Sequence, residues 1–116
     1  MREDEPHIVE IVIRHELAIK ELYKIFATKF TNRQDLWRSL AADEHRHADW
    51  LRTLRSEPTI TKLLHDSQLK PQAIKTSTAY VESQLMKAKE GHLSLLQALS
   101  IARDIENAAL EMLFPS

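Results

Sequence analysis

The sequence predicts an all-α fold built as a bundle of amphipathic helices, and three observations lead to this. Apolar residues recur at steps of three and four along most of the chain, which is the period of a helix packed on one side. No segment shows the sustained alternation of a half-buried strand. The helix-breaking residues are few and separate the apolar runs, at Pro6, Pro58, Pro71, Gly91 and Pro115. Short connections between such helices favour an up-and-down four-helix bundle.

Length and composition restrict the function classes. The 116 residues suit a single domain spanning 1–116, and 43% apolar with 28% charged residues is the balance of a globular protein. A single glycine excludes the glycine-rich phosphate loops, which need several. The absence of cysteine excludes disulfides, thiol nucleophiles and thiolate-held metals. The 16 basic and 17 acidic residues provide no overall attraction to nucleic acid or to an anionic membrane. We therefore expect neither as a partner, and chemistry based on carboxylates and imidazoles stays open.

Targeting signals are not evident. The first residues are acidic and precede only a short apolar run, whereas a secretory signal begins with basic residues and has a longer apolar stretch. No run approaches the roughly 20 apolar residues of a membrane span. The default expectation is therefore a cytoplasmic location, and the lack of cysteine fits a reducing compartment without requiring one.

Two long helices are predicted in the first half of the chain. The first begins near Pro6, a favourable first-turn residue behind an acidic segment that suits the positive end of a helix dipole. It extends to about Phe30. The segment Thr31–Asp35 reads as a break with capping residues, and the second helix covers about Arg33 to Arg55.

The second half contains two more predicted helices. A helical turn is expected over Ile60–His65, before the third helix, which runs from Pro71 to about Glu90. Gly91 stands where a helix C-terminal stop is favoured. Ser94 and Gln97 have the spacing of a capping box and begin the fourth helix, which is expected to reach Phe114.

The most informative residues are polar ones on the stripes that should be buried. On the second helix, Glu44 and His47 lie one turn apart on one face, with leucines above and below. The predicted stripe there is Leu36 or Trp37, Leu40, Glu44, His47, Leu51 and Leu54.

The first and fourth helices repeat this pattern. Glu21 falls on the predicted stripe of the first helix and Glu106 on that of the fourth; the stripes are Ile13, Leu17, Glu21, Ile25 and Thr28, and Leu99, Ala102, Glu106, Ala109 and Leu113. Rotating the fourth helix by one residue would instead place Ile105 inside. Glu82 lies beside the stripe of the third helix rather than on it, and His15 has no partner at ligand spacing.

A bound cation would account for all of these inward acids. An isolated carboxylate in an apolar setting costs several kcal/mol unless it is paired, protonated or bound to a cation. Glu44 and His47 would direct an oxygen and a nitrogen at one point from adjacent turns. Mixed carboxylate and imidazole donors suit iron or manganese better than structural zinc. The sequence thus predicts a metal site formed by Glu21, Glu44, His47 and Glu106.

Three segments carry a resemblance to a known family. They are Ala18–Phe26 around Glu21, Leu40–His47 with the Glu-x-x-His pair, and, more weakly, Ala98–Glu106. With these the sequence resembles the ferritin-like, rubrerythrin-type diiron carboxylate proteins. The resemblance implies a four-helix bundle that holds two iron ions per site, with manganese as the alternative. It also implies oxidation of Fe(II), or reduction of peroxide or oxygen, as a rubrerythrin-like oxidoreductase.

One part of the family pattern is missing. The family takes one glutamate from each of two helices and a Glu-x-x-His from each of the other two. Glu21, Glu44 with His47, and Glu106 fill three places in the expected order, but no second Glu-x-x-His follows Glu106. Three possibilities stay open: a truncated chain, a partial or lost site, or a homodimer or higher oligomer that supplies ligands from two chains. The cysteine-held rubredoxin iron site is also missing, so electrons would come from a separate donor or from Fe(II).

A non-enzymatic interpretation competes with this one. A ferritin-like bundle whose site has decayed would serve as an oligomerising or adaptor module. In that case Glu44 and His47 are a solvated helix pair. The aromatic residues Tyr23, Trp37 and Trp50 could shuttle electrons beside a diiron centre, but at helical spacing packing is their more frequent role.

Overall fold

The computed structural model describes residues 8–59, 62–63 and 70–113, and its long elements are all helical. No strand occurs in these ranges, which confirms the predicted all-α class. The elements in chain order are α1 (Ile8–Lys29), the 3-10 turn η1 (Thr31–Arg33), α2 (Gln34–Leu54), α4 (Pro71–Lys89) and α5 (Leu95–Leu113). Measured against a bilayer, no helix in the described part has the length and apolarity of a membrane span.

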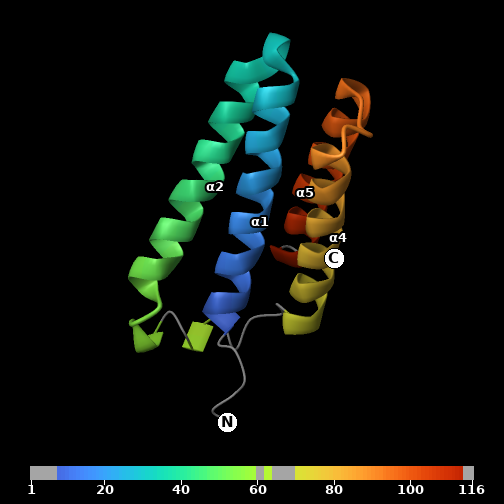
Figure 1. Ribbon diagram of the computed structural model, residues 1–116. Coiled ribbons are helices and arrows are strands. Elements are labelled where there is room, and N and C mark those ends of the chain that lie inside the picture. Colours follow the sequence, from blue (N-terminus) through green and yellow to red (C-terminus); the bar gives the residue numbers. More distant parts are fainter. Residues whose placement is uncertain (1–7, 60–61, 64–69, 114–116) are drawn as a thin grey trace.

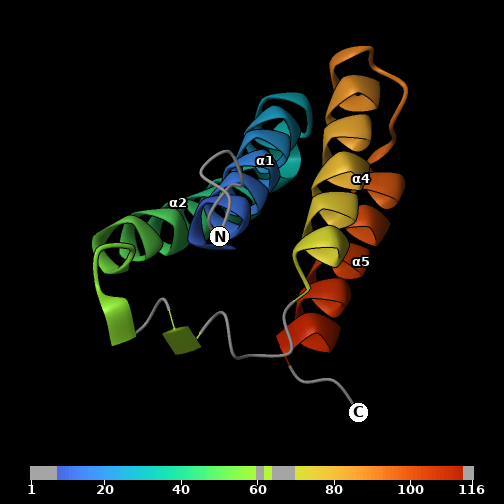
Figure 2. The ribbon, with the colours of Figure 1, turned by 90° about the horizontal axis from the view of Figure 1, so that it is seen from below.

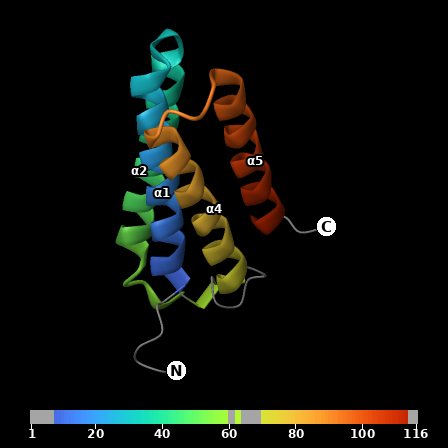
Figure 3. The same ribbon diagram turned by 45° about the vertical axis from the view of Figure 1, so that its right-hand side comes forward.

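The helices form two antiparallel pairs. Helix α1 turns through η1 into α2, and α4 turns into α5 (Figures 1 and 2). Helix α1 is the central element, because it packs along both α2 and α4. Helix α5 approaches its neighbours less closely, and its C-terminal end diverges from the other helices (Figure 3).

The predicted boundaries agree well with these helices. The break at Thr31–Asp35 corresponds to η1 and the start of α2, and Pro71 is the first residue of α4. Gly91 has a φ of 81°, a left-handed conformation that favours glycine at a helix end. The expected start at Pro6 and end at Phe114 lie outside the described residues. Of the turn expected over Ile60–His65, only residues 62–63 are described, and both are helical.

The predicted capping box begins α5. The backbone N–H of Gln97 donates to Ser94 Oγ at 3.2 Å, and the backbone N–H of Ser94 donates to Gln97 Oε1 at 2.9 Å. We expect Ser94→Ala to lower the free energy of unfolding by about 1 kcal/mol, because the first turn loses a hydrogen-bond acceptor. Urea denaturation will measure this, with Ser94→Thr as the control that keeps the hydroxyl. An equal loss in both variants would contradict a capping role.

Aromatic packing defines the main core. Tyr23, Phe26 and Trp37 are fully buried where the C-terminal part of α1 packs beside the start of α2. The ring centroids of Phe26 and Trp37 are 4.8 Å apart. Tyr23 and Trp37 lie in the packing role that their helical spacing predicted, whereas Trp50 does not, because it is 63% exposed. A second buried cluster joins the N-terminal half of α1 to α2 and α4, and it includes Val9, Ala48, Leu51 and Ile74.

His15 is a buried polar residue between α1 and α4. It is 5% exposed, and its Nε2 lies 2.9 Å from Ser77 Oγ on α4. No local pattern indicates this partner, which lies 62 residues away along the chain. Burial lowers the pKa of His15 from its usual value of 6.5, because the charged imidazolium is poorly solvated there.

This burial predicts a pH dependence of stability. As pH falls below about 6.5, the unfolded chain protonates His15 before the folded protein does, so unfolding becomes easier. The expected contribution is at most about 1.4 kcal/mol per pH unit, for one proton. Urea denaturation of the metal-free protein between pH 7.5 and 5 (about one unit either side of the unperturbed pKa) should show a smaller loss for His15→Gln than for the unmodified chain. Parallel losses in the two proteins would show that His15 is not the titrating group.

Candidate metal centre

Glu44 occupies a core position of α2. Buried residues recur on this helix at Trp37, Ala41, Glu44, Ala48 and Leu51, in steps of three and four. The prediction that Glu44 faces inward is therefore confirmed: the residue is 6% exposed. Its Oε2 is buried and has no hydrogen-bond partner in the described part of the molecule. A buried carboxylate oxygen in this state is costly, and a cation would satisfy it.

His47 lies at the mouth of the site. Its Nδ1 is 3.7 Å from Oε2 of Glu44, too long for a hydrogen bond but suited to two groups around an ion. The prediction that His47 lies within the buried stripe is wrong, because Ala48 occupies that position and the His47 side chain is 61% exposed. The two residues nevertheless come together as the Glu-x-x-His spacing predicted.

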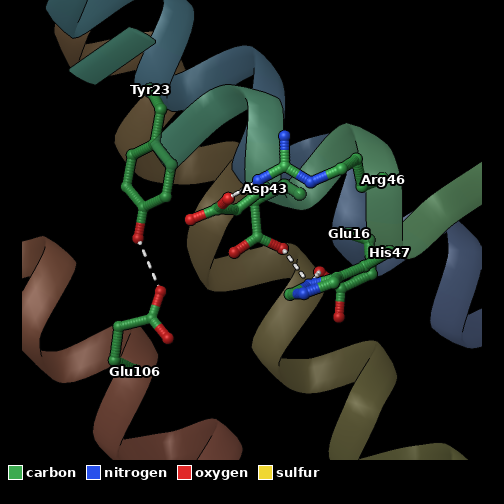
Figure 4. A network of polar contacts seen from close by, with 7 residues as sticks. Glu16, Tyr23, Asp43, Arg46, His47 and Glu106 are labelled. Atoms are coloured by element: carbon green, nitrogen blue, oxygen red, sulfur yellow. Dashed lines mark hydrogen bonds and ion pairs between the residues drawn. The ribbon is translucent and has the colours of Figure 1, made fainter. Parts of the chain in front are cut away.

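Glu16 of α1 completes the group. Its Oε2 is 3.7 Å from His47 Nδ1, and its side chain is 20% exposed. One ligand atom from each of Glu16, Glu44 and His47 lies within 4.8 Å of the others. Figure 4 shows Glu16 and His47 approaching each other from α1 and α2. The three residues therefore converge on a point that one metal ion could occupy, and we call them the acid–imidazole group.

The pKa of Glu16 is shifted mainly by burial. Burial raises the pKa of Glu16 above its usual range, and the nearby carboxylate of Glu106 raises it further, while His47 opposes the shift. Carboxylates held together in a partly buried site repel each other, and a divalent cation relieves this repulsion.

Glu106 reaches the same region from α5. Tyr23 donates a hydrogen bond from its hydroxyl to Glu106 Oε1 at 3.1 Å (Figure 4). Burial and the Glu106 charge together raise the pKa of Tyr23, so the phenol stays protonated and remains a donor. The expectation that Glu106 lies on the buried stripe is wrong: Ile105 takes that position at 3% exposure and Glu106 is exposed. Glu106 is thus held by Tyr23 at the edge of the site.

Glu21 lies away from the acid–imidazole group. It is exposed on α1, and its Oε1 is 3.9 Å from Lys24 Nζ. The prediction of an inward Glu21 is therefore wrong. The physical reason is that α1 packs against two helices, so apolar residues surround most of it and do not define one stripe.

A signal for Glu16 does exist in the sequence. Val9, Glu16 and Tyr23 are each seven residues apart, which places them on one face of a helix. Val9 and Tyr23 are both fully buried, and Glu16 lies between them. A stripe drawn through Val9 and Tyr23 includes Glu16 and excludes Glu21.

The group has the chemistry of an oxygen-and-nitrogen metal site. Two carboxylates and one imidazole offer three ligands, which leaves coordination positions for water, substrate or a further carboxylate. Iron, manganese and zinc all accept such donors. Comparison with protein-family models, curated proteins and solved structures finds no match for this chain. The geometry of the acid–imidazole group itself therefore indicates a metal centre.

Proposed function

We propose that this protein binds iron, with manganese as the alternative, through Glu16, Glu44 and His47. The observation that carries the proposal is the buried Glu44 Oε2, which lacks a hydrogen-bond partner in the described structure while a second carboxylate and an imidazole converge on it. A carboxylate that only stabilised the fold would be expected to accept hydrogen bonds at this depth. Glu106, held by Tyr23 beside Glu16, is the proposed additional ligand.

We further propose that the protein is of the ferritin-like, rubrerythrin type. Glu16, Glu44 with His47, and Glu106 would fill three of the four places in the family pattern, with Glu16 replacing the Glu21 expected from the sequence. The fourth place would come from a second copy of the chain. Iron held by these residues would supply the chemistry for oxidation of Fe(II), or for reduction of peroxide or oxygen. Here Tyr23 would orient Glu106, and the core around Trp37 would exclude water from one side of the site.

Metal analysis tests this proposal directly. Protein purified without chelator, or titrated anaerobically with Fe(II), should hold at least one ion for each acid–imidazole group, as the donor count requires. Glu16→Gln and Glu44→Gln should lose the ion. Glu21→Gln is the matched control, because it removes the same charge from an exposed position of the same helix as Glu16. Negligible metal in the unmodified chain, or equal loss from Glu21→Gln, would refute the site.

A second candidate function is an oligomerising or adaptor module. The observation in its favour is a row of exposed leucines on α5, with Leu96 77%, Leu99 38% and Leu110 56% exposed. Exposed apolar rows of this kind are typical of interaction surfaces. Native mass spectrometry would report chain count and bound metal together. A metal-free oligomer that Leu96→Lys dissociates would favour the adaptor function, whereas a metal-bearing dimer would support the ferritin-like one.

A further inference from the structure

A cationic groove lies between α1 and α2. It has a volume of about 480 Å³, and three alanines, Ala27, Ala41 and Ala42, contribute to its lining. Its basic lining residues come from both helices and are Lys20, Lys24, Arg38, His45 and Arg46. Helical geometry turns Arg38 and His45 away from His47 on α2, so the groove and the acid–imidazole group lie on different flanks of this helix.

The positive charge in this groove is incompletely neutralised. Lys24 is 3.9 Å from Glu21, Arg46 pairs with Asp43, and His45 Nε2 lies 3.1 Å from Asp49 Oδ2. Lys20 and Arg38 have no acidic partner within ion-pair distance among the residues that the structure describes. Lys20 and Lys24 are four residues apart on one helix, a like-charge pair that disfavours the helix slightly. A net charge of −1 for the whole chain makes this concentration of basic groups a local feature.

We propose that this groove binds a small phosphate-bearing molecule whose apolar or aromatic part lies against the alanines. Arginine presents a planar fork that matches a phosphate, and lysine adds a compact charge. Ala42 is exposed, and the small side chains of Ala27 and Ala41, 5% and 7% exposed, form the floor on which a ring would lie. The groove has the volume of a small-molecule site. Nucleotides combine these two chemistries in one molecule.

The lining argues for a small molecule over a nucleic-acid strand. Strand-binding surfaces combine basic residues with exposed aromatic residues on which successive bases stack. The residues that line this groove include no aromatic ring other than His45, and Gln34 and Thr28 complete its polar lining. Gln34 is fixed there by donating a hydrogen bond from Nε2 to the Ala27 carbonyl at 3.2 Å.

Isothermal titration calorimetry of the full chain with ADP, without divalent cations, tests the proposal. We expect saturable binding at one site, and weaker binding of inorganic pyrophosphate, which lacks the ring. Lys20→Gln and Arg38→Gln should each weaken ADP binding about tenfold, the effect of losing one charge-assisted hydrogen bond. Ala42→Glu, at an exposed position of the groove, should abolish binding.

Two control variants establish whether ADP binds in the groove itself. Arg103→Gln removes the same charge from α5, outside the groove, and should leave ADP binding unchanged. Glu44→Gln alters the acid–imidazole group and should also leave it unchanged, so the metal proposal and this one fail independently. Absence of saturable ADP binding, or an equal loss from Arg103→Gln, would overturn the proposal. Tighter binding of a single-stranded oligonucleotide that depends on Lys20 and Arg38 would also overturn it, in favour of a nucleic-acid surface.

Discussion

Adding Fe(II) anaerobically, or Mn(II), to the metal-free protein will raise its midpoint of thermal unfolding, and the acid–imidazole group will account for the increase. A metal that binds only the folded state stabilises it by mass action, by about 2.7 kcal/mol at a free concentration one hundred times Kd. For a domain of this size, that corresponds to an increase of about 10 °C. Differential scanning calorimetry at matched pH will measure the shift.

Variants of the ligands locate the source of this stabilisation. Glu16→Gln and Glu44→Gln should remove most of the increase, because each replaces a charged oxygen donor with a neutral amide. Glu21→Gln should retain it, since Glu21 is exposed and paired with Lys24. A shift that survives Glu44→Gln and disappears with Glu21→Gln would mean that the metal binds on the outer face of α1.

The course of α2 could be predicted from the sequence because this helix buries a single face. The buried positions run in steps of three and four from Trp37 through Glu44 to Leu51, although Leu36 and Trp50 on the same helix are exposed. The predicted stripe includes His47, whereas Ala48 is the buried residue and His47 lies beside that face. A stripe indicates which face of a helix is buried but not where that face ends. Local signals were equally informative: Gly91 and the Ser94–Gln97 pair each act within a few residues, so the sequence contains the whole interaction.

The position of α1 could not be predicted in the same way. A helix between two neighbours buries residues around much of its circumference. The spacing of its apolar residues then fits several choices of the inner face. The stripe through Glu21 is one of these faces, and the structure buries a different one, on which Glu16 lies. Contacts between distant segments, such as His15 with Ser77 and Tyr23 with Glu106, depend on how helices pack and leave no local pattern. The groove between α1 and α2 was missed for this reason, because its basic residues are scattered along the chain.

Replacing Glu44 by methionine should stabilise the metal-free protein while removing its response to metal. The carboxylate is buried, its Oε2 has no hydrogen-bond partner among the described residues, and the Nδ1 atom of His47 lies 3.7 Å from that oxygen. Replacing buried ion pairs by apolar side chains of similar volume is often neutral or stabilising, with gains of about 1–4 kcal/mol. Here the remaining partner, His47, is 61% exposed and stays solvated when Glu44 is replaced. We expect a gain near the lower end of that range, because Glu44→Met also removes the approach to His47. Urea denaturation of metal-free protein will measure it.

The exposed Glu21→Met is the control for this experiment, because surface substitutions usually change stability by less than about 0.5 kcal/mol. A loss of stability in metal-free Glu44→Met would show that the fold itself uses this carboxylate, and it would remove the reason for placing a cation there. A gain without metal, combined with loss of the metal-dependent increase, would mean that Glu44 is kept at this depth at a cost to the fold. That outcome would indicate that the Glu44 carboxylate serves metal binding, because it would not stabilise the fold.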